Sequence, residues 1–284
     1  MMLNLMPLVL PPLVEQTAIA TFLDHETARI DALVAEQERL IALLQEKRQA
    51  VISHAVTQGL NPDAPMKDSG VEWLGEVPGH WDAITLRRCA IAVQTGGTPP
   101  VDALSESLDE GFVWYTPGDF GSSLTLSTST RRIANEAVAS GEAKVFPPKS
   151  VLIVSIGATL GKVGFAQDTS SANQQINAVI PGARVEGYFL TWSLSVKTEA
   201  MRFLSNASTI GIMNQEKTKE IWIALPPREE QTAIATFLDD ETAKLDALIT
   251  QARTAITLLQ ERRTALISAA VTGQIDVRGW AKAA

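Results

Sequence analysis

Residues that could carry out covalent or metal chemistry are few and widely separated in this sequence. The chain contains one cysteine, Cys89, and three histidines, His25, His54 and His80, which lie far apart. A single cysteine excludes an internal disulfide framework, and the histidines do not have the spacing of a metal site. We therefore expect neither a bound metal nor an internal disulfide in this chain.

The segment Gly157–Val163, GATLGKV, resembles a phosphate-binding loop but departs from it in two ways. Only three residues separate its glycines rather than four, and Val163 stands where such a loop has a magnesium-binding Ser or Thr. The sequence also lacks a Gly-rich dinucleotide fingerprint, a G-x-S-x-G nucleophile elbow and the Asn-Pro-Pro-Tyr or Asp-Pro-Pro-Tyr tetrapeptide of amino-methyltransferases. These absences favour a protein that binds over one that catalyses.

The chain has 284 residues and carries 24 Lys and Arg against 32 Asp and Glu, a formal net charge of −8. Its composition, 45% hydrophobic and 20% charged, is typical of a globular protein long enough for two domains. No apolar run reaches the roughly 20 residues of a membrane helix, and the N-terminus lacks the marks of a signal peptide. We expect a soluble cytoplasmic protein, whose acidic balance argues mildly against unaided binding to nucleic acid.

An internal repeat organises the chain. The stretch LPPLVEQTAIATFLD at Leu10 recurs as LPPREEQTAIATFLD at Leu225, and 31 of the 48 positions from Leu10 to Thr57 match the residue 215 places later. In each copy a double proline suits a helix start. We expect a short helix over Glu15–Leu23 and a long one over Asp24–Val56, with the same pair in the second copy.

The apolar residues of the repeats recur close to every 3.5 positions, the period of a coiled coil. The predicted stripe comprises Leu23, Ile30, Leu33, Leu40, Leu44 and Val51 in the first copy and Leu238, Leu245, Leu248, Leu259 and Leu266 in the second. Gln37 and Ala252 interrupt it. Each stripe must be covered, so we expect two long helices packed as an antiparallel coiled coil. A larger helical bundle is the alternative.

The segment between the repeats, about residues 61–224, is richer in Gly, Ser, Thr and Pro and favours strands. The predicted strands are Ala83–Leu86, Phe112–Tyr115, Val151–Ile156, Val163–Ala166 and Gln175–Ile180. One amphipathic helix is expected from Gly187 to Leu204, with the core candidates Phe189, Trp192, Leu194, Met201 and Phe203. The predicted fold class is α+β, with one mixed α/β domain and two long helices.

The repeats, followed by MKDSGVEWLGEVPGHW, resemble the specificity subunit of type I restriction-modification enzymes. The motif around Gly96–Pro99, with WYTPGDF, VSIGATLGKVGFA, SANQQINAVI and IALPPREEQ, is similar to that family's target recognition domain and second helical spacer. On this resemblance, the remnant of a missing domain (residues 1–12) precedes a helical spacer repeat (13–60), a target recognition domain (61–224), a second spacer repeat (225–275) and a tail (276–284). The family's usual subunit has two recognition domains, so this chain resembles half a subunit.

The resemblance implies a non-catalytic protein that reads bases in double-stranded DNA and docks methyltransferase (M) and restriction (R) subunits there. Those partners would use S-adenosylmethionine, ATP and Mg²⁺, and no cofactor is expected in this chain. A chain with one recognition domain could regain a second by forming a homodimer or by pairing with another half-subunit. Two alternatives stay open. The chain could be a decoy that occupies the methyltransferase without reading DNA, or a recombination cassette that donates its central domain.

Base readout needs side chains that donate and accept hydrogen bonds in a groove, and phosphate contact needs Lys and Arg. The candidates for base readout are Gln94, Thr98, Asn173, Gln174 and Gln175, with Asn214 and Gln215 in addition. The candidates for phosphate contact are Arg131, Arg132, Lys144, Lys149 and Lys162, which outnumber Glu136 and Glu142 in the same stretch. Polar strand ends and solvated surface charges are the alternative interpretation of these two sets.

The first segment of each repeat is too apolar to face solvent, which makes Ile19, Phe22, Ile234 and Phe237 candidates for docking a partner. Packing within the chain's own helix pair would explain them equally well. Because the chain is acidic, we expect it to bind DNA weakly alone. The methyltransferase would then supply most of the contacts with phosphates.

Overall fold

The computed structural model describes residues 10–100, 103–104, 110–205 and 211–280. The chain divides into two compact units, the first made of residues 1–48 and 241–284 and the second of residues 49–240. The predicted remnant and tail lie partly outside the described residues, which begin at 10 and end at 280. Among the described residues, neither long helix nor any shorter one has an apolar stretch that could cross a membrane.

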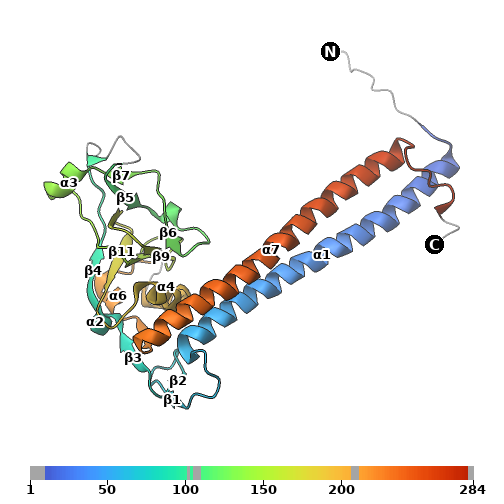
Figure 1. Cartoon of the computed structure of the whole chain (residues 1–284). Coiled ribbons are helices and arrows are strands. Elements are labelled where there is room, and N and C mark those ends of the chain that lie inside the picture. The colour runs from blue at the N-terminus through green and yellow to red at the C-terminus, as the bar shows by residue number, and fades with distance from the viewer. Residues whose placement is uncertain (1–9, 101–102, 105–109, 206–210, 281–284) are drawn as a thin grey trace. The chain divides into compact units, whose positions relative to one another are not determined.

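The first unit is built from parts of two long helices, α1 (Leu13–Gln58) and α7 (Arg228–Val271), which lie side by side in it (Figure 1). Three contacts fix their relative direction: the ion pairs Arg48–Asp246 and Asp31–Arg263, and the packing of Phe22 on Ala270. As the residue number rises along α1, its partner's number falls along α7. The expected antiparallel helix pair is confirmed.

The less exposed positions of the two helices follow spacings of four and three in turn, as a heptad seam requires. In α1 they include Ile30, Val34, Gln37, Ile41, Leu44 and Arg48, and in α7 they include Leu245, Ile249, Ala252, Ile256, Leu259 and Arg263. Three residues predicted for the stripe are outside it, because Leu33, Leu40 and Leu248 are 40%, 42% and 47% exposed. They occupy the heptad position beside the seam.

The two flanks of this helix pair differ in chemistry. One flank carries the ion pairs Arg48–Asp246 and Asp31–Arg263, each with 3.1 Å between Nε and Oδ1. The two pairs are equivalent in the repeat, so the helix pair has an internal two-fold symmetry. By heptad position the opposite flank carries five exposed leucines, which we name the leucine row: Leu33, Leu40, Leu43, Leu248 and Leu258.

Each repeat forms one continuous helix, so the predicted division at Asp24 is wrong. α1 is helical from Leu13 to Gln58, and α7 is helical from Arg228 to Val271. The polar residues near the expected break hydrogen-bond within the helix instead of capping a new one. Thr27 Oγ1, for example, donates to Leu23 O at 2.6 Å.

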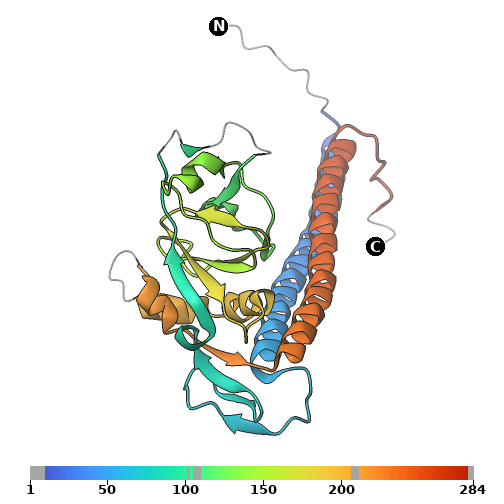
Figure 2. The same cartoon turned by 60° about the vertical axis from the view of Figure 1, so that its left-hand side comes forward.

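The second unit contains a five-stranded sheet of order β4-β11-β8-β9-β6 and a three-stranded sheet of order β10-β5-β7 (Figure 2). The first sheet consists of β4 (Ala90–Thr95), β6 (Thr125–Leu126), β8 (Ser150–Val154), β9 (Val163–Ala166) and β11 (Ile176–Pro181). The second consists of β5 (Phe112–Tyr115), β7 (Arg132–Ile133) and β10 (Ser170–Ala172). Two further ladders pair β1 (Met66–Asp68) with β2 (Glu76–Pro78) and β3 (Asp82–Thr85) with β12 (Trp222–Leu225). All five predicted strands are present, with ends shifted by at most two residues.

Short helices connect the strands. They are α2 (Leu86–Cys89), α3 (Asn135–Ala139), α4 (Gly187–Ser195), α5 (Thr198–Ser205) and α6 (Gln215–Lys219). The single helix predicted over Gly187–Leu204 is therefore wrong. It is interrupted at Val196 and Lys197, where the buried Lys197 places its ammonium 4.5 Å from the centre of the Trp73 ring. The interruption changes the phase of α5, so that Met201 is buried while Phe203, a core candidate, is 83% exposed.

The start of α7 is anchored in the second unit through its first turn. Gln231 is fully buried, and its Nε2 donates to Arg184 O at 2.9 Å and to Pro226 O at 2.8 Å. Its Oε1 accepts a hydrogen bond from Glu186 N at 2.7 Å. The main core of this unit includes residues from both long helices, among them Ile52, Val56, Ile234 and Leu238. These contacts fix the frame on which the sheet and its loops stand.

Candidate nucleic-acid interface

The candidates for base readout lie at one end of the five-stranded sheet, where β4 ends and β11 begins. Gln94 is exposed on β4 and pairs in register with Ala178 of β11. Thr98 is exposed in the loop that follows β4, and residues 173–175 form the turn between β10 and β11. The fold thus brings together polar residues from two distant parts of the sequence.

Gly96 allows these two parts to meet. Its N–H donates to Ile176 O at 2.9 Å, and the N–H of Gly97 donates to Ala172 O at 2.8 Å. A Cβ atom at position 96 would lie 2.2 Å from Ala172 O and 2.3 Å from Asn173 O, well inside van der Waals contact. Only glycine permits this approach of two backbones. The loop that carries Thr98 is therefore held directly against the turn that carries Gln174.

The turn over residues 173–175 is stiffened by its own hydrogen bonds. Asn173 Oδ1 accepts from Gln175 N at 2.9 Å, and Asn173 Nδ2 donates to Gln175 Oε1 at 3.2 Å. Ser155 Oγ donates to Gln175 O at 2.9 Å. Gln174 is exposed, and its side chain makes no hydrogen bond with the residues that the structure describes. Asn173 and Gln175 therefore shape the turn, and Gln174 is its available donor and acceptor.

Asn214 and Gln215 belong to the support behind this end of the sheet. Asn214 caps α6, and the side-chain amide of Gln215 lies 3.0 Å from Thr95 Oγ1. Asn177, which sequence patterns did not single out, is 1% exposed and links β4 to the segment before α6. It accepts from Thr95 Oγ1 and donates to Met213 O, both at 2.8 Å. A polar residue within the apolar run INAVI was the available signal for this network.

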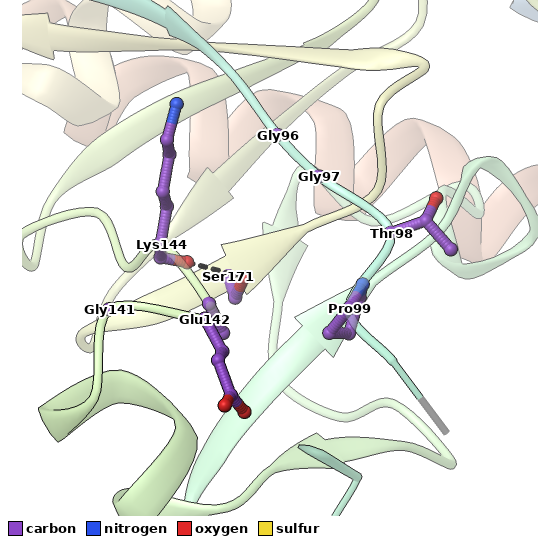
Figure 3. Close-up of a pocket in the computed structure, with 9 residues that line it drawn as sticks. Gly96, Gly97, Thr98, Pro99, Gly141, Glu142, Lys144 and Ser171 are labelled. Carbon is purple, nitrogen blue, oxygen red and sulfur yellow. Dashed lines mark hydrogen bonds between the residues drawn. The ribbon is translucent and has the colours of Figure 1, made fainter. Parts of the chain in front are cut away.

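A groove of about 120 Å³ opens beside the loop that follows β4 (Figure 3). Its lining includes the loop Gly96–Pro99, the segment Gly141–Lys144 and Ser171 of β10. Ser171 Oγ donates to Lys144 O at 2.6 Å, which fixes the backbone of the second segment. Figure 3 shows the side chains of Glu142 and Lys144 extending in opposite directions. One candidate cation thus lies across the groove from the readout loop.

Arg131 and Arg132 are neighbours but differ in freedom. Arg132 is half-buried, and its Nη1 donates to Gly111 O at 2.8 Å. Arg131 is exposed, and its guanidinium carbon lies 5.7 Å from the centre of the Trp114 ring. Trp114 Nε1 in turn donates to Gly97 O at 3.2 Å. Arg131 therefore lies near the readout loop with its donors available, while Arg132 is engaged by the backbone.

The remaining two phosphate candidates do not extend this surface. Lys162 Nζ donates to Phe120 O at 2.9 Å, so its ammonium is held by the backbone. Lys149 precedes β8 and Ser155 follows it, so these two residues lie at opposite ends of the strand, roughly 20 Å apart at the usual rise per residue. Lys149 therefore lies a strand's length from the readout turn that Ser155 contacts, and the five cations grouped in the sequence do not all belong to this surface.

The candidates for partner docking are largely enclosed by the chain itself. Phe22 is 8% exposed and packs with Ala270 and Val277, and Ile234 is 1% exposed in the main core. Ile19 is half-buried and Phe237 is 38% exposed. Packing within each unit therefore accounts for Phe22 and Ile234.

The side chains at this end of the sheet are mainly polar or cationic. Among the described residues, no three His, Cys, Asp or Glu side chains are grouped so that they could hold a metal ion. Burial raises the pKa of the Cys89 thiol to about 11, so the thiol stays protonated at neutral pH. What the loops present is a set of hydrogen-bond donors and acceptors with two cations beside them.

Comparison with known proteins places these features in a family. Residues 89–258 match the family described as type I restriction modification DNA specificity domain. The chain is 29% identical over 169 residues to the type I restriction enzyme MjaIX specificity subunit of Methanocaldococcus jannaschii, covering 58% of this chain and 38% of that protein. It is 22% identical over 288 residues to the type I restriction enzyme EcoBI specificity subunit of Escherichia coli, covering 95% of this chain and 59% of that protein. The chain thus spans between 38% and 59% of the length of these curated relatives.

Two solved structures share the fold. One, from work on the complex assembly and conformational transition of the type I R-M system, aligns with a TM-score of 0.73 at 21% identity, over 92% of this chain and 60% of that one. The HsdS subunit from Thermoanaerobacter tengcongensis aligns with a TM-score of 0.58 at 19% identity, over 97% of this chain and 65% of that one. At these identities the likeness establishes the fold.

Proposed function

Because the chain belongs to the family of type I restriction modification DNA specificity domains, we propose that its recognition domain reads one half-site of duplex DNA. The family match covers residues 89–258, which include both sheets of the second unit apart from the short ladders. We further propose that the chain does this for methyltransferase and restriction subunits, which carry out the chemistry.

One observation carries this proposal: Thr98, Gln174 and Lys144 meet at one end of the sheet on loops held by backbone hydrogen bonds. Hydroxyl and amide groups can read the edges of bases, while Lys and Arg neutralise phosphates. Loops that are already rigid lose little conformational freedom when they bind. This combination suits the recognition of a nucleic-acid groove.

The charge of the chain limits how tightly it can bind DNA alone. The net charge is −8, and of the five predicted phosphate contacts only Arg131 and Lys144 lie near the readout residues with available side chains. Since each neutralised phosphate adds to affinity, two cations give weak binding at physiological salt. We therefore expect the methyltransferase to contribute most phosphate contacts. Nanomolar binding by the isolated chain at about 150 mM salt would contradict this expectation.

The leucine row is the surface that we propose for docking the methyltransferase. Its five leucines are between 40% and 59% exposed on one flank of the helix pair. Helices with a heptad seam and further apolar residues on one flank are typical of bundles with more than two helices. Exposed apolar patches of this kind commonly mark interaction surfaces. The surface replaces Phe22 and Ile234, which are already covered.

Substitution on the two flanks tests this docking surface. Leu40→Lys and Leu43→Lys together place charge in the leucine row, and we expect the chain to lose co-purification with its methyltransferase. Ala42→Lys and Gln45→Lys add the same two charges at exposed positions of the ion-pair flank and serve as the matched control. Equal retention of the methyltransferase by both variants would show that it docks elsewhere.

Methylome sequencing tests the proposed reading of DNA. Cells that carry the chain with its methyltransferase should show a modified motif that is absent from cells without the chain. Gln174→Ala should relax that motif at one base, because it removes the available amide of the readout turn. Gln167→Ala, an equally exposed glutamine between β9 and β10 at the other end of these strands, should leave the motif unchanged. If the chain instead suppresses methylation by an intact subunit and adds no motif, the decoy alternative is correct.

A further inference from the structure

Trp114 is linked to the three segments that carry Thr98, Arg131 and Lys144. It lies in β5, is 5% exposed, and pairs in register with Ser171 of β10. Its indole and backbone contact the segments around Gly97 and Arg131, and the apolar cluster to which it belongs extends to Ala143, beside Lys144. Each of these segments carries one candidate for DNA contact, namely Thr98, Arg131 and Lys144.

The first contact fixes the readout loop. Trp114 Nε1 donates to Gly97 O at 3.2 Å, directly before Thr98. The N–H of Gly97 is held on the other side by Ala172 O at 2.8 Å. A peptide bonded through both of these groups cannot rotate freely, so the direction of Thr98 depends on the indole N–H.

The second contact fixes a cation. The guanidinium carbon of Arg131 lies 5.7 Å from the centre of the indole ring. The N–H of Trp114 donates to Arg131 O at 3.0 Å, and Ser129 Oγ donates to Trp114 O at 2.9 Å. Arg131 forms no ion pair with the residues that the structure describes. A planar guanidinium held over an aromatic face is already oriented, and its hydrogen-bond donors remain free for a ligand.

The link to the opposite wall of the groove is indirect. Ala143 packs into the small apolar cluster that contains Trp114, and it lines the groove beside Lys144. Ser171, the register partner of Trp114, donates from Oγ to Lys144 O at 2.6 Å. Trp114 is therefore linked to both walls of the groove, to one through Gly97 and to the other through Ala143 and Ser171.

We propose that Trp114 is a positioning residue that sets the distance between base reading and phosphate contact. Through the Gly97 carbonyl it orients Thr98 toward a base edge, and through its ring and cluster it holds Arg131 and Lys144 toward the flanking phosphates. The ligand is duplex DNA, so the inference rests on the function proposed above. It adds that specificity at the base read by the Thr98 loop depends on a residue that never touches DNA.

The test uses the full chain at about 50 mM salt, where weak binding is measurable, and a pool of duplexes with a randomised centre. The measured quantity is the ratio of affinity for the selected duplex to affinity for the unselected pool. Trp114→Phe keeps an aromatic ring at this position and removes the indole N–H together with part of the buried ring. Trp73→Phe is the matched control, because Trp73 also lies under a cation, Lys197, and takes no part in the groove.

We expect Trp114→Phe to lower the affinity ratio about fivefold to tenfold, the usual effect of losing one readout interaction. Thr98→Ala should lower it by a similar factor, and the double variant should lose no more than either single one, since both changes act on one contact. The slope of log affinity against log salt should stay the same for Trp114→Phe, because no charge is lost. Trp73→Phe should leave both quantities unchanged.

Arg131 gives a second measurement that does not depend on the fold of a Trp114 variant. Arg131→Ala should reduce the salt slope by about one unit, and Arg131→Lys should restore the slope without restoring the affinity ratio, because Lys lacks the planar stacked group. An unchanged affinity ratio in Trp114→Phe, or a double variant with Thr98→Ala whose losses multiply, would overturn the proposal. A native chain that prefers no duplex would instead overturn the proposed function.

Discussion

The two copies of the repeat begin with the same residues but lie in different surroundings. In the second copy Leu225 is 3% exposed in β12, and Gln231 is fully buried. In the first copy the equivalent Leu10 is 73% exposed, and Gln16 is half-buried. The same sequence therefore specifies a helix start in both places, but the strands and loops of the second unit decide whether that start is buried.

Gln16 and Gln231 distinguish the hydrogen bonds that the repeat makes within itself from those that it makes with the rest of the domain. Gln16 Nε2 donates to Pro11 O at 2.8 Å, and Gln231 Nε2 makes the equivalent bond to Pro226 O at the same distance. Within the described part of the chain, only the side chain of Gln231 has further hydrogen bonds, to Arg184 O and from Glu186 N. The local bond belongs to the repeat sequence itself, and the additional bonds belong to the domain that covers the second copy. Four pairs of matched substitutions can break or sharpen this distinction.

The largest difference is expected from the buried glutamine. Gln231→Ala removes the partner of Glu186 N and of two carbonyls, which leaves buried polar groups unsatisfied. We expect it to lower the free energy of unfolding by about 3 kcal/mol. Gln16→Ala, which loses one local bond, should cost about 0.5 kcal/mol. Urea denaturation followed by circular dichroism measures both, and equal losses would show that the repeat sequence alone sets the effect.

The leucine before the double proline gives the next difference. Leu225→Ala empties a site in the main core, and we expect a loss of about 2.5 kcal/mol in the free energy of unfolding. Leu10→Ala changes an exposed side chain and should alter that free energy by less than about 0.5 kcal/mol. Thermal denaturation compares the two variants with the native chain. A comparable loss for Leu10→Ala would mean that the first copy is covered in solution.

A smaller difference is expected at Glu230 and its equivalent in the first copy, Glu15. Glu230 accepts from His80 Nε2 at 2.7 Å and from Trp81 Nε1 at 3.0 Å, whereas the equivalent Glu15 has neither partner. Glu230→Ala should lower the free energy of unfolding by about 1 kcal/mol, because the indole N–H of the buried Trp81 loses its acceptor. Glu15→Ala should be nearly neutral. Urea titrations of the two variants under one buffer condition decide between these outcomes.

The smallest effect concerns a tyrosine. Burial, and then its hydrogen bond to Asp239 at 2.6 Å, raise the pKa of Tyr188 to about 12. Asp239→Asn should lower that pKa, while Asp24→Asn in the first copy should not. Ultraviolet absorbance of tyrosinate measures it, with Tyr188→Phe to separate the signal from Tyr115, whose pKa burial also raises to about 12.

The direction of the accompanying stability change follows from proton binding. Between pH 10 and 12 the folded chain keeps these tyrosine protons while the unfolded chain releases them. This contribution to stability is therefore complete below pH 10 and is lost as the pH rises toward 12. A stability that rises over this interval would contradict the assignment.

Sequence patterns predicted which helices and strands are present better than they predicted which face of each helix is buried. The repeat predicted the antiparallel pair, and β-branched runs predicted five strands. The predicted seam was partly wrong because Leu33 and Leu40 are seven residues apart, as residues of a seam can be, but lie one position before the seam residues Val34 and Ile41. Phe203 failed for a similar reason, since the break at Val196 and Lys197, where Lys197 contacts the distant Trp73, changes the phase of the helix.

The candidate site was predictable by residue type but not by place. Gln94, Thr98 and Gln174 lie together because Gly96 joins two loops, a contact that no local pattern reveals. Charge counting grouped Lys149 with Lys144, although the length of β8 separates Lys149 from Ser155, which contacts the readout turn. The supporting residues Asn177 and Trp114 were missed because their roles depend on partners far away in the sequence.

The two equivalent ion pairs of the helix pair have a consequence for stoichiometry. A rotation of half a turn about an axis perpendicular to the two helices exchanges the ion pair Arg48–Asp246 with Asp31–Arg263. The same rotation exchanges Leu33 with Leu248 and Leu43 with Leu258, whereas Leu40 corresponds to Ala255, so four of the five leucines form two equivalent pairs. A partner that recognised one leucine of each pair would therefore meet a second, equivalent place on the same chain.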